Sequence, residues 1–175
     1  MKISVVMASF LGNYPNRAKN AQKKFIRVVN SFKKQTYEDK ELIIVSDGCP
    51  ITNKLYNQHF SQDENIKLVS IEKQPLYGAE VRNAGIRQAQ GDVICYLDND
   101  DIFGKKHLQT IAEQFDTNEI DWVYYNDYLV MSSDFKQLSP RTVEPRYGSV
   151  GTSSIAHKNF HKYNNFNYKP TWYTS

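Results

Sequence analysis

The sequence predicts a single α/β domain in which helices flank a mostly parallel sheet. Two observations support this: strands alternate with amphipathic helices over the first 130 residues, and most strand runs lack the polar alternation of half-exposed strands. At 175 residues, with 40% hydrophobic and 23% charged residues, the chain is long enough for one substantial core. A net charge of +3 gives no indication of a nucleic-acid or membrane-surface partner.

The first half of the chain contains three predicted strands. Ile3–Ser9 and Glu41–Ser46 are continuous apolar runs, as expected for strands buried on both faces. Ile66–Ile71 alternates apolar and polar residues, which indicates a strand nearer the edge of the sheet. Helices are expected at residues 18–32, at Ile51–Phe60 and at Ala79–Ala89, the last with Gly91 in its C-cap region.

An apolar run, Val93–Leu97, stops abruptly at Asp98, Asp100 and Asp101. Ligands of parallel sheets bind beyond the carboxyl ends of the strands, which is where these acids fall. If the chain stays extended through Asn99, Asp98 and Asp100 point the same way. Two such carboxylates repel each other unless a cation lies between them, and oxygen ligands suit Mg²⁺ or Mn²⁺. The alternative is an acidic turn that caps the next helix, for which Asp101 alone would suffice.

The second half of the chain is less regular. A helix is expected at Lys105–Phe115 and a strand region at Trp122–Met131. Ser139–Gly151 contains two prolines and two glycines, which is typical of a long loop, and Thr152–His157 is consistent with one more short strand. Residues 159–175 show no periodicity. Their aromatic residues would suit a sugar-stacking face, and the alternatives are a poorly ordered tail or a partner-binding edge.

Four segments in this order resemble family 2 glycosyltransferases with the GT-A (Rossmann-like) fold: Ile3–Phe10, Leu42–Cys49, Gly78–Gly85 and Gly91–Asp101. The resemblance implies a nucleotide-sugar-binding α/β core over residues 1–131 and a partial acceptor-side region of the same domain over residues 132–175. It also implies an inverting, hexosyltransferase-type enzyme that uses Mn²⁺ or Mg²⁺. The sugar would pass from a nucleotide-sugar, with a UDP-sugar favoured, to a hydroxyl of a saccharide or other acceptor.

The resemblance also implies roles for residues on the nucleobase side. Ala8, Ser9 and Phe10 would line the base pocket, with Phe10 stacking on the base. Asp47 would accept the N3–H of uracil. The structural alternatives are a core role for Phe10 and a turn role for Asp47 before Gly48.

On the phosphate side, the resemblance places Arg82 and Asn83 toward the nucleotide from the start of their helix. Asp98 would lie near the ribose and the metal, with Asn99 beside it, and Asp100 would bind the metal directly. The alternative for Arg82 is a solvated side chain on a helix surface.

The catalytic base is the main departure from the family pattern. In the family it is an Asp well beyond the metal motif, whereas no Asp or Glu follows Glu144 here. Asp127 and His157 are weak candidates for the base, and a structural role is the more common one for each. His161 is a further histidine for which a structural role is favoured.

Two rival functions follow. A nucleotide-sugar-binding module without catalysis would need the same fold and metal site. A nucleotidyltransferase would need a Gly-rich loop after the first strand, where residues 12–17 supply only one glycine.

The start of the chain and its two cysteines bear on where in the cell the protein is found. Met1-Lys2 leads directly into the first strand, so no signal peptide or transmembrane segment is predicted at the start of the chain. Cys49 and Cys95 show no metal-binding spacing. We therefore expect reduced thiols in a cytoplasmic protein.

Overall fold

The computed structural model describes residues 1–14, 19–75, 78–117, 119–131, 137–146 and 148–163. Six-stranded and two-stranded sheets, five α-helices and one 3₁₀ turn are assigned in this part of the chain. The elements are β1 (Ile3–Ser9), α1 (Ala21–Lys33), β2 (Lys40–Asp47), α2 (Pro50–His59), β3 (Ile66–Ile71), α3 (Ala79–Gln88), β4 (Val93–Tyr96), α4 (His107–Thr117), β5 (Trp122–Tyr124), β6 (Asp127–Val130), β7 (Leu138–Arg141), η1 (Thr152–Ser154), β8 (Ile155–Lys158) and α5 (Phe160–Tyr163).

The main sheet has the strand order β3-β2-β1-β4-β8-β5. The pairs β3–β2, β2–β1 and β1–β4 are parallel, whereas β8 is antiparallel to both of its neighbours. The prediction of an α/β fold with a mostly parallel sheet is therefore confirmed. The edge position predicted for β3 is also confirmed, because β3 pairs only with β2.

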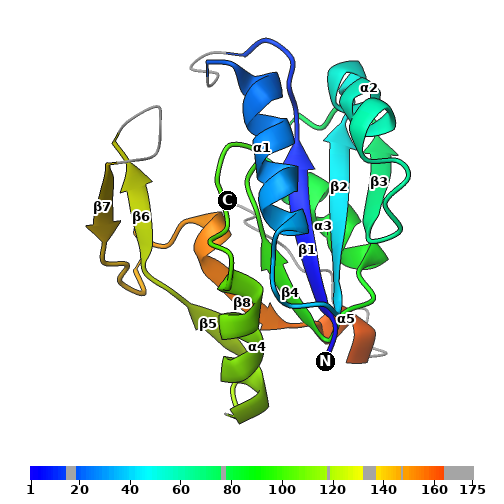
Figure 1. Cartoon of the computed structure of the whole chain (residues 1–175). Helices are drawn as coiled ribbons and strands as arrows, with labels where there is room; N and C mark the ends of the chain where they lie inside the picture. The colour runs from blue at the N-terminus through cyan, green and yellow to red at the C-terminus, as the bar shows by residue number, and fades with distance from the viewer. Residues whose placement is uncertain (15–18, 76–77, 118, 132–136, 147, 164–175) are drawn as a thin grey trace.

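Helices cover both faces of the sheet, with α1 in front of it and α3 behind (Figure 1). Alternate residues of β1 face opposite sides: Met7 joins the cluster that contains Phe25 of α1, whereas Val6 packs with Ile86 of α3. Gly85 allows α3 to lie close to the sheet, because a Cβ there would stand 2.5 Å from Val6 Cγ1. Burial on both faces explains why these strands lack polar alternation.

The strand region predicted at Trp122–Met131 is two strands in different sheets. β5 pairs with β8 in the main sheet, whereas β6 pairs with β7 in a hairpin that stands apart from it (Figure 1). The chain leaves the main sheet at Asn126, whose side-chain oxygen accepts a hydrogen bond from the backbone of Val143. The long loop predicted at Ser139–Gly151 is wrong at its start, because β7 includes Ser139, Pro140 and Arg141.

Two smaller expectations also differ from the structure. α3 ends at Gln88 with Ala89 as its cap residue, and Gly91 instead packs against β1, where a Cβ would stand 2.6 Å from the backbone nitrogen of Ser4. The short strand expected at Thr152–His157 begins only at Ile155, after a 3₁₀ turn.

Residue 18 and residues 164–175 lie outside the described part of the chain, as does the side chain of residue 163. Among the described residues, no helix has both the length and the apolar character needed to cross a membrane.

Candidate functional site

The carboxyl ends of β2, β1 and β4 meet at one edge of the sheet. Ser9 of β1 lies opposite Ser46 of β2, and Val6 of β1 lies opposite Tyr96 of β4. This register brings the segment after β1 and Asp47 at the end of β2 to the same edge as the acids after β4. The sequence predicted binding residues on all three segments, and the structure brings the segments together.

Asp47 is a buried carboxylate that holds the segment after β3. Its Oδ2 accepts a hydrogen bond from Lys73 Nζ at 2.5 Å, and its Oδ1 accepts one from the backbone nitrogen of Gln74 at 2.7 Å. The turn at Gly48 makes this approach possible: its φ is +57°, and a Cβ would stand 2.7 Å from the backbone nitrogen of Lys73. Lys73 Nζ also lies 4.7 Å from the centroid of the Phe10 ring. Lys73 lies outside the four segments that the sequence analysis singled out. It contacts both Phe10 and Asp47, the two residues predicted to bind the nucleobase.

The side chain of Ser9 packs between β1 and α2. Its hydroxyl lies 3.0 Å from that of Thr52, and both residues are buried. Ala8 is partly buried on the opposite face of the strand, beside the cluster that contains Val45. Cys49 Sγ accepts a hydrogen bond from the backbone of Leu11 at 3.2 Å. The edge after β1 is therefore held to the start of α2 by buried polar contacts.

The thiol of Cys49 is electrostatically unusual for a buried group. Burial by itself raises the pKa of Cys49, but hydrogen bonds from Thr52, from the backbone of Leu11 and from the backbone of Ile51 outweigh it. The pKa of Cys49 is lowered as a result. Cys95 has no such donors, and burial alone raises its pKa. Both cysteines are free thiols in the structure.

Arg82 and Asn83 are adjacent on α3 but have different environments. The Arg82 guanidinium donates a hydrogen bond to Asp98 Oδ1 at 2.8 Å, so it reaches the acids after β4. Asn83 is buried, and its Oδ1 accepts no hydrogen bond from a described residue. Of the two predicted residues, only Arg82 makes a direct contact with the acids.

The acids after β4 lie in a turn instead of an extended strand. β4 ends at Tyr96, and the backbone nitrogen of Asp101 donates a hydrogen bond to the carbonyl of Asp98 at 3.1 Å. The expectation of an extended chain through Asn99 is therefore wrong, because this hydrogen bond closes a turn at Asn99 and Asp100. Strand alternation then no longer determines where the carboxylates of Asp98 and Asp100 point.

The helix-capping alternative for these acids is not observed either. α4 begins at His107 and has no acidic residue in its first turn. The backbone nitrogen of Leu108 instead donates to Gln35 Oε1, at the end of α1, at 3.0 Å.

Ser153, just before β8, connects the acids. Its hydroxyl oxygen accepts a hydrogen bond from the backbone nitrogen of Asp98 at 2.9 Å, and its hydroxyl also bonds the carboxylate of Asp101. The pKa of Asp101 is raised, first by burial of its carboxyl group and then by the charges of Asp98, Asp100 and Asp127. Ser153 was not predicted, and a serine 55 residues from its partner gives no sequence signal.

This cluster suits a cation only in part. The charges of Asp98, Asp100 and Asp127 add to the effect of burial in raising the pKa of Asp101, and a divalent cation would offset the part that comes from these charges. Within the described residues, however, no three Asp, Glu, His or Cys side chains form a group that could hold a metal ion. Phosphate oxygens and water would have to complete the shell, as is common for Mg²⁺.

A cavity of about 610 Å³ lies beside the acids, on the side away from β2. Asp100, Asp101 and Asp127 contribute to its wall, together with Ser153 and the first residues of α4. Asp127 accepts two hydrogen bonds from Arg141, one of them 2.7 Å from Nε, and a third from Ser154. The hydrogen bonds from Arg141 are the main reason that the pKa of Asp127 is lowered.

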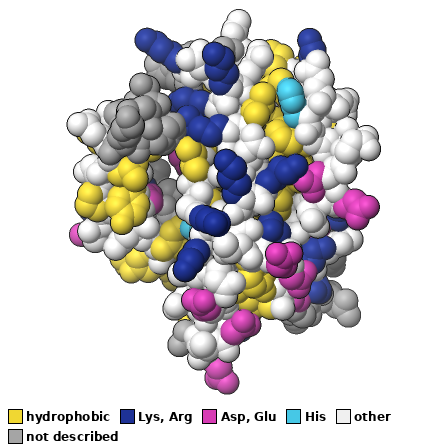
Figure 2. All heavy atoms as spheres, in the orientation of Figure 1, with side chains coloured by type: hydrophobic (Ala, Val, Ile, Leu, Met, Phe, Trp, Pro, Cys, Tyr) yellow, Lys and Arg dark blue, Asp and Glu magenta, His cyan; other side chains and the backbone are white. Residues whose placement is uncertain are grey.

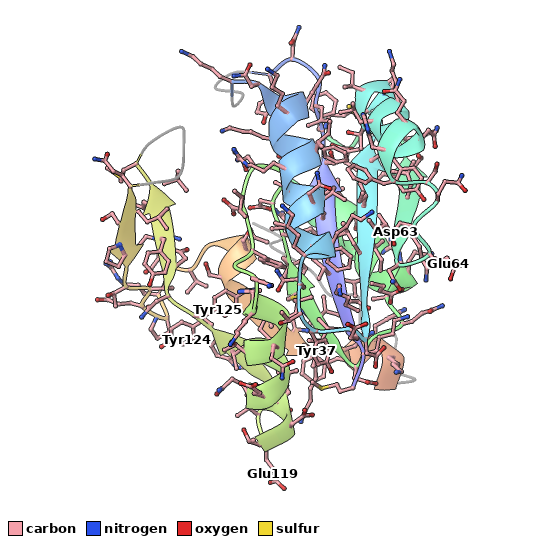
Figure 3. The ribbon with its side chains drawn as sticks, viewed as in Figure 1. Tyr37, Asp63, Glu64, Glu119, Tyr124 and Tyr125 are labelled. Atoms are coloured by element: carbon pink, nitrogen blue, oxygen red, sulfur yellow. The ribbon has the colours of Figure 1, made fainter. Side chains whose placement is uncertain are left out.

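His107 and Tyr125 form a partly buried pair in the wall of this cavity. Tyr125 follows β5 and lies beside α4 (Figure 3). Its hydroxyl donates to the carbonyl of Ser153 at 2.7 Å, so it accepts from His107 Nε2, 3.0 Å away. This assigns the proton of a neutral His107 to Nε2. Burial lowers the pKa of His107 to about 4.

The two histidines considered as bases lie elsewhere. His157 is in β8, and its ring nitrogens lie 2.7 Å from the Tyr96 hydroxyl and 2.7 Å from the carbonyl of Lys158. Burial lowers the pKa of His157. His161 is exposed on α5. Neither histidine lines the cavity.

A mostly parallel α/β sheet, with the segments after β1 and β2 and the acidic turn after β4 at one edge, is the GT-A fold of glycosyltransferases. The sequence profile described as "Glycosyl transferase family 2" matches residues 17–171. The chain belongs to that family.

Two known proteins illustrate the similarity. The uncharacterized glycosyltransferase alr2836 of Nostoc sp. is 28% identical over 134 residues, which cover 77% of this chain and 39% of alr2836. The poly(ribitol-phosphate) beta-N-acetylglucosaminyltransferase TarS of Staphylococcus aureus is 25% identical over 147 residues, which cover 80% of this chain and 24% of TarS. The chain thus spans less than half the length of either relative.

Two crystal structures have the same fold. That of TarS residues 1–349 in complex with UDP-GlcNAc has a TM-score of 0.66 and 21% identity, covering 91% of this chain and 46% of that chain. That of the mannosyltransferase PcManGT from Pyrobaculum calidifontis, in complex with GDP-Man and Mn²⁺, has a TM-score of 0.54 and 14% identity. It covers 90% of this chain and 44% of that chain.

Proposed function

We propose that this chain binds a UDP-sugar at the carboxyl edge of its sheet and transfers the sugar, with inversion, to an acceptor hydroxyl. The observation that carries the proposal is the convergence of Asp47, Phe10, Arg82 and the Asp98–Asp101 turn at that edge. Family membership supports sugar transfer, and the UDP-GlcNAc complex of TarS supports a uridine nucleotide. The GDP-Man complex of the mannosyltransferase shows that this fold also accepts another base.

The nucleobase would lie between Phe10 and Asp47. The ring of Phe10 is partly exposed and offers a stacking face, while Asp47 offers an acceptor for N3–H. Lys73 and Gln74 already donate to Asp47, so uracil must share a carboxylate oxygen with one of them. Ala8 and Ser9 would then support this pocket through their backbone and packing.

The diphosphate would lie between Arg82 and the acidic turn. Asp98 and Asp100 would hold Mn²⁺ or Mg²⁺, with Asn99 between them at the turn, and the bound cation would stabilise the leaving diphosphate as a Lewis acid. Arg82 would donate to phosphate oxygens, since its guanidinium is already directed to this turn by Asp98. Asn83, whose Oδ1 is buried without a hydrogen bond from a described residue, would support the start of α3.

The acceptor would enter the acid-lined cavity beside this turn. An inverting displacement needs a base to take the proton of the acceptor hydroxyl. Asp127 is engaged by Arg141 and Ser154, and both ring nitrogens of His157 are engaged within the sheet. Either group would have to give up one of these contacts to take the proton, so we propose that the base is a different group. Because both candidate bases are engaged in hydrogen bonds, a second function is also favoured, in which the chain binds a nucleotide-sugar without transferring the sugar.

Calorimetric titration of UDP and GDP, each with Mn²⁺ and with chelator, tests the donor site. We expect UDP to bind more tightly than GDP and only in the presence of Mn²⁺. Binding of neither nucleotide would contradict the proposal. Incubation with UDP-GlcNAc and simple saccharide acceptors then separates the two functions, because a binding module releases sugar to water slowly and forms no glycoside.

A further inference from the structure

A second hollow, of about 820 Å³, lies between α1 and the segment 102–105 that precedes α4. We call it the basic groove. Among the described residues, its wall contains no acidic side chain and four basic ones: Lys23, Arg27, Lys34 and Lys105. Lys and Arg side chains gather over the face where α1 lies, whereas most of the acidic side chains of this view lie below and to the right (Figure 2).

The spacing of three of these cations shows that they form one stripe along α1. Lys23, Arg27, Asn30 and Lys34 follow one another by four, three and four residues, which puts them on one side of the helix. The first turn of α1 contains no acidic residue, and basic residues there oppose the helix dipole. The stability of α1 therefore does not explain the position of Lys23.

Most of these charges are available to a ligand. Lys23, Lys34 and Lys105 are exposed, and none of them forms an ion pair with a described residue. By comparison, Lys33, which is on the same helix but outside the groove, pairs with Asp63 at 2.9 Å.

The floor of the groove is held by hydrogen bonds. The backbone nitrogen of Phe103 donates to Ser31 Oγ at 3.2 Å, and Gln35 Nε2 donates to the carbonyl of Gly104 at 2.8 Å. The backbone nitrogen of Thr36 donates to the carbonyl of Lys105 at 3.1 Å. These bonds attach the segment 102–105 along the end of α1, so the groove exists before any ligand binds.

The groove and the acid-lined cavity are adjacent. Ile102, Phe103 and Lys105 line both hollows, one on each side of the same segment. Arg27 also donates to the backbone carbonyl of Asp100 at 3.3 Å, which ties the basic stripe to the acidic turn. A ligand that occupied both hollows would have to cross this segment, which lines each of them.

We propose that the basic groove binds phosphate carried by an extended acceptor whose hydroxyl lies in the acid-lined cavity. This rests on the proposed function. Lys and Arg without acidic neighbours suit phosphate, which accepts several charge-assisted hydrogen bonds. From Lys23 to Lys34 the helix rises roughly 16 Å, longer than a diphosphate, so the donor nucleotide does not account for the stripe. A hollow fits a discrete phosphate-bearing chain better than a flat membrane surface does.

The test uses the full chain and inorganic polyphosphate of about ten units as the probe, titrated calorimetrically in chelator at low and high salt. The wild-type chain should bind the probe, and salt should weaken binding. Lys23→Glu with Lys34→Glu should lower affinity at least tenfold. Lys19→Glu with Lys54→Glu, which changes the net charge equally on exposed residues outside the groove, should change affinity less than twofold. Equal losses in both variants, or no binding by the wild-type chain, would overturn the proposal.

Two further measurements distinguish the remaining outcomes. Binding of UDP with Mn²⁺ should be the same in wild type and in the groove variant, because the donor site lies on other residues. Failure of the wild-type chain to bind UDP would overturn the proposed function and, with it, the assignment of the phosphate to an acceptor.

Sedimentation with phosphatidylglycerol and with phosphatidylcholine vesicles tests whether the groove binds a membrane surface instead. Groove-dependent binding to the anionic vesicles, without polyphosphate binding, would overturn the proposal in favour of a lipid surface.

Discussion

Arg82 Nη2 donates to Asp98 Oδ1 at 2.8 Å, and this ion pair joins α3 to the segment that leaves β4. The two residues come from different elements, and their contact sets the position of the guanidinium at the edge of the sheet. Gly78 contributes, because a Cβ there would stand 2.9 Å from Arg82 Nη1. The pair leaves Arg82 beside the place proposed for phosphate and partly neutralises Asp98 while no cation is bound.

Replacing Arg82 should therefore change metal and nucleotide binding in opposite directions. Arg82→Ala removes a phosphate donor, so UDP affinity in Mn²⁺ should fall about tenfold. It also frees the carboxylate of Asp98, so affinity for Mn²⁺ alone should rise. Calorimetry with UDP and a paramagnetic titration of Mn²⁺ measure the two effects. Arg87→Ala, which breaks only an exposed pair with Glu80 on the same helix, is the control. A fall in both affinities would show that the variant damages the fold instead.

Asp100 should be needed for metal-dependent binding. Asp100→Ala removes a proposed metal ligand, whereas the ion pair of Arg82 with Asp98 remains. UDP binding in Mn²⁺ should fall to the level seen in chelator, with no loss of thermal stability because the side chain is exposed. Unchanged UDP affinity in Mn²⁺ would remove Asp100 from the metal site.

Asp101 should destabilise the metal-free protein at neutral pH. Its pKa is raised in the folded state, so the ionised group costs free energy above that pKa, and the cost disappears as pH falls through it. Asp101→Asn should raise the free energy of unfolding at pH 7.5 by a few tenths of a kcal/mol, since solvent screens much of the repulsion. Urea unfolding at pH 7.5 and pH 5 measures this, and the gain should be smaller at pH 5. A variant less stable than wild type at pH 7.5 would contradict the repulsion among these carboxylates.

Asp47 offers a test of base recognition. Asp47→Ala should weaken UDP about tenfold or more but leave inorganic diphosphate affinity nearly unchanged. Because Asp47 also holds Lys73, the variant Lys73→Met is the matched comparison: it removes the ion pair and keeps the carboxylate. Lys73→Met should weaken UDP less than threefold. Equal effects of the two variants on UDP would show that Asp47 acts only by holding the segment after β3.

The sequence predicted those parts of the fold whose signal is local. β1 and β2 are visible as apolar runs and β3 as an alternating run, because the burial of each strand follows from residues within it. β7 was missed because Pro140 suggests a loop, although it is tolerated in a strand of a two-stranded sheet. The division between β5 and β6 was missed because both halves are apolar or aromatic, and nothing local shows that the chain changes sheets.

The candidate site was predictable where residues follow strand ends and unpredictable where partners come from distant segments. Asp47, Arg82 and Asp98 reach one edge because parallel strands align their carboxyl ends. Their partners Lys73 and Ser153 depend on how the segment after β3 and the turn before β8 fold back. Only the tertiary structure specifies these contacts.

His107 should make the stability of the protein sensitive to mild acid. Its pKa is about 4 in the folded state and about 6.5 when unfolded, so the unfolded chain binds a proton first as pH falls. Stability is therefore fully present above pH 6.5 and is lost toward pH 4. Between pH 7 and pH 5 this amounts to about 2 kcal/mol in the free energy of unfolding.

His107→Gln removes the titrating group and can still donate a hydrogen bond to the Tyr125 hydroxyl. We expect the loss of stability between pH 7 and pH 5 to be smaller in this variant by about 2 kcal/mol. His157 has a lowered pKa of the same sign, so it contributes equally to wild type and variant and cancels in the comparison. Urea unfolding curves of both proteins at the two pH values measure the difference. Parallel loss in the two proteins would mean that His107 is not held neutral by burial beside Phe103 and Tyr125.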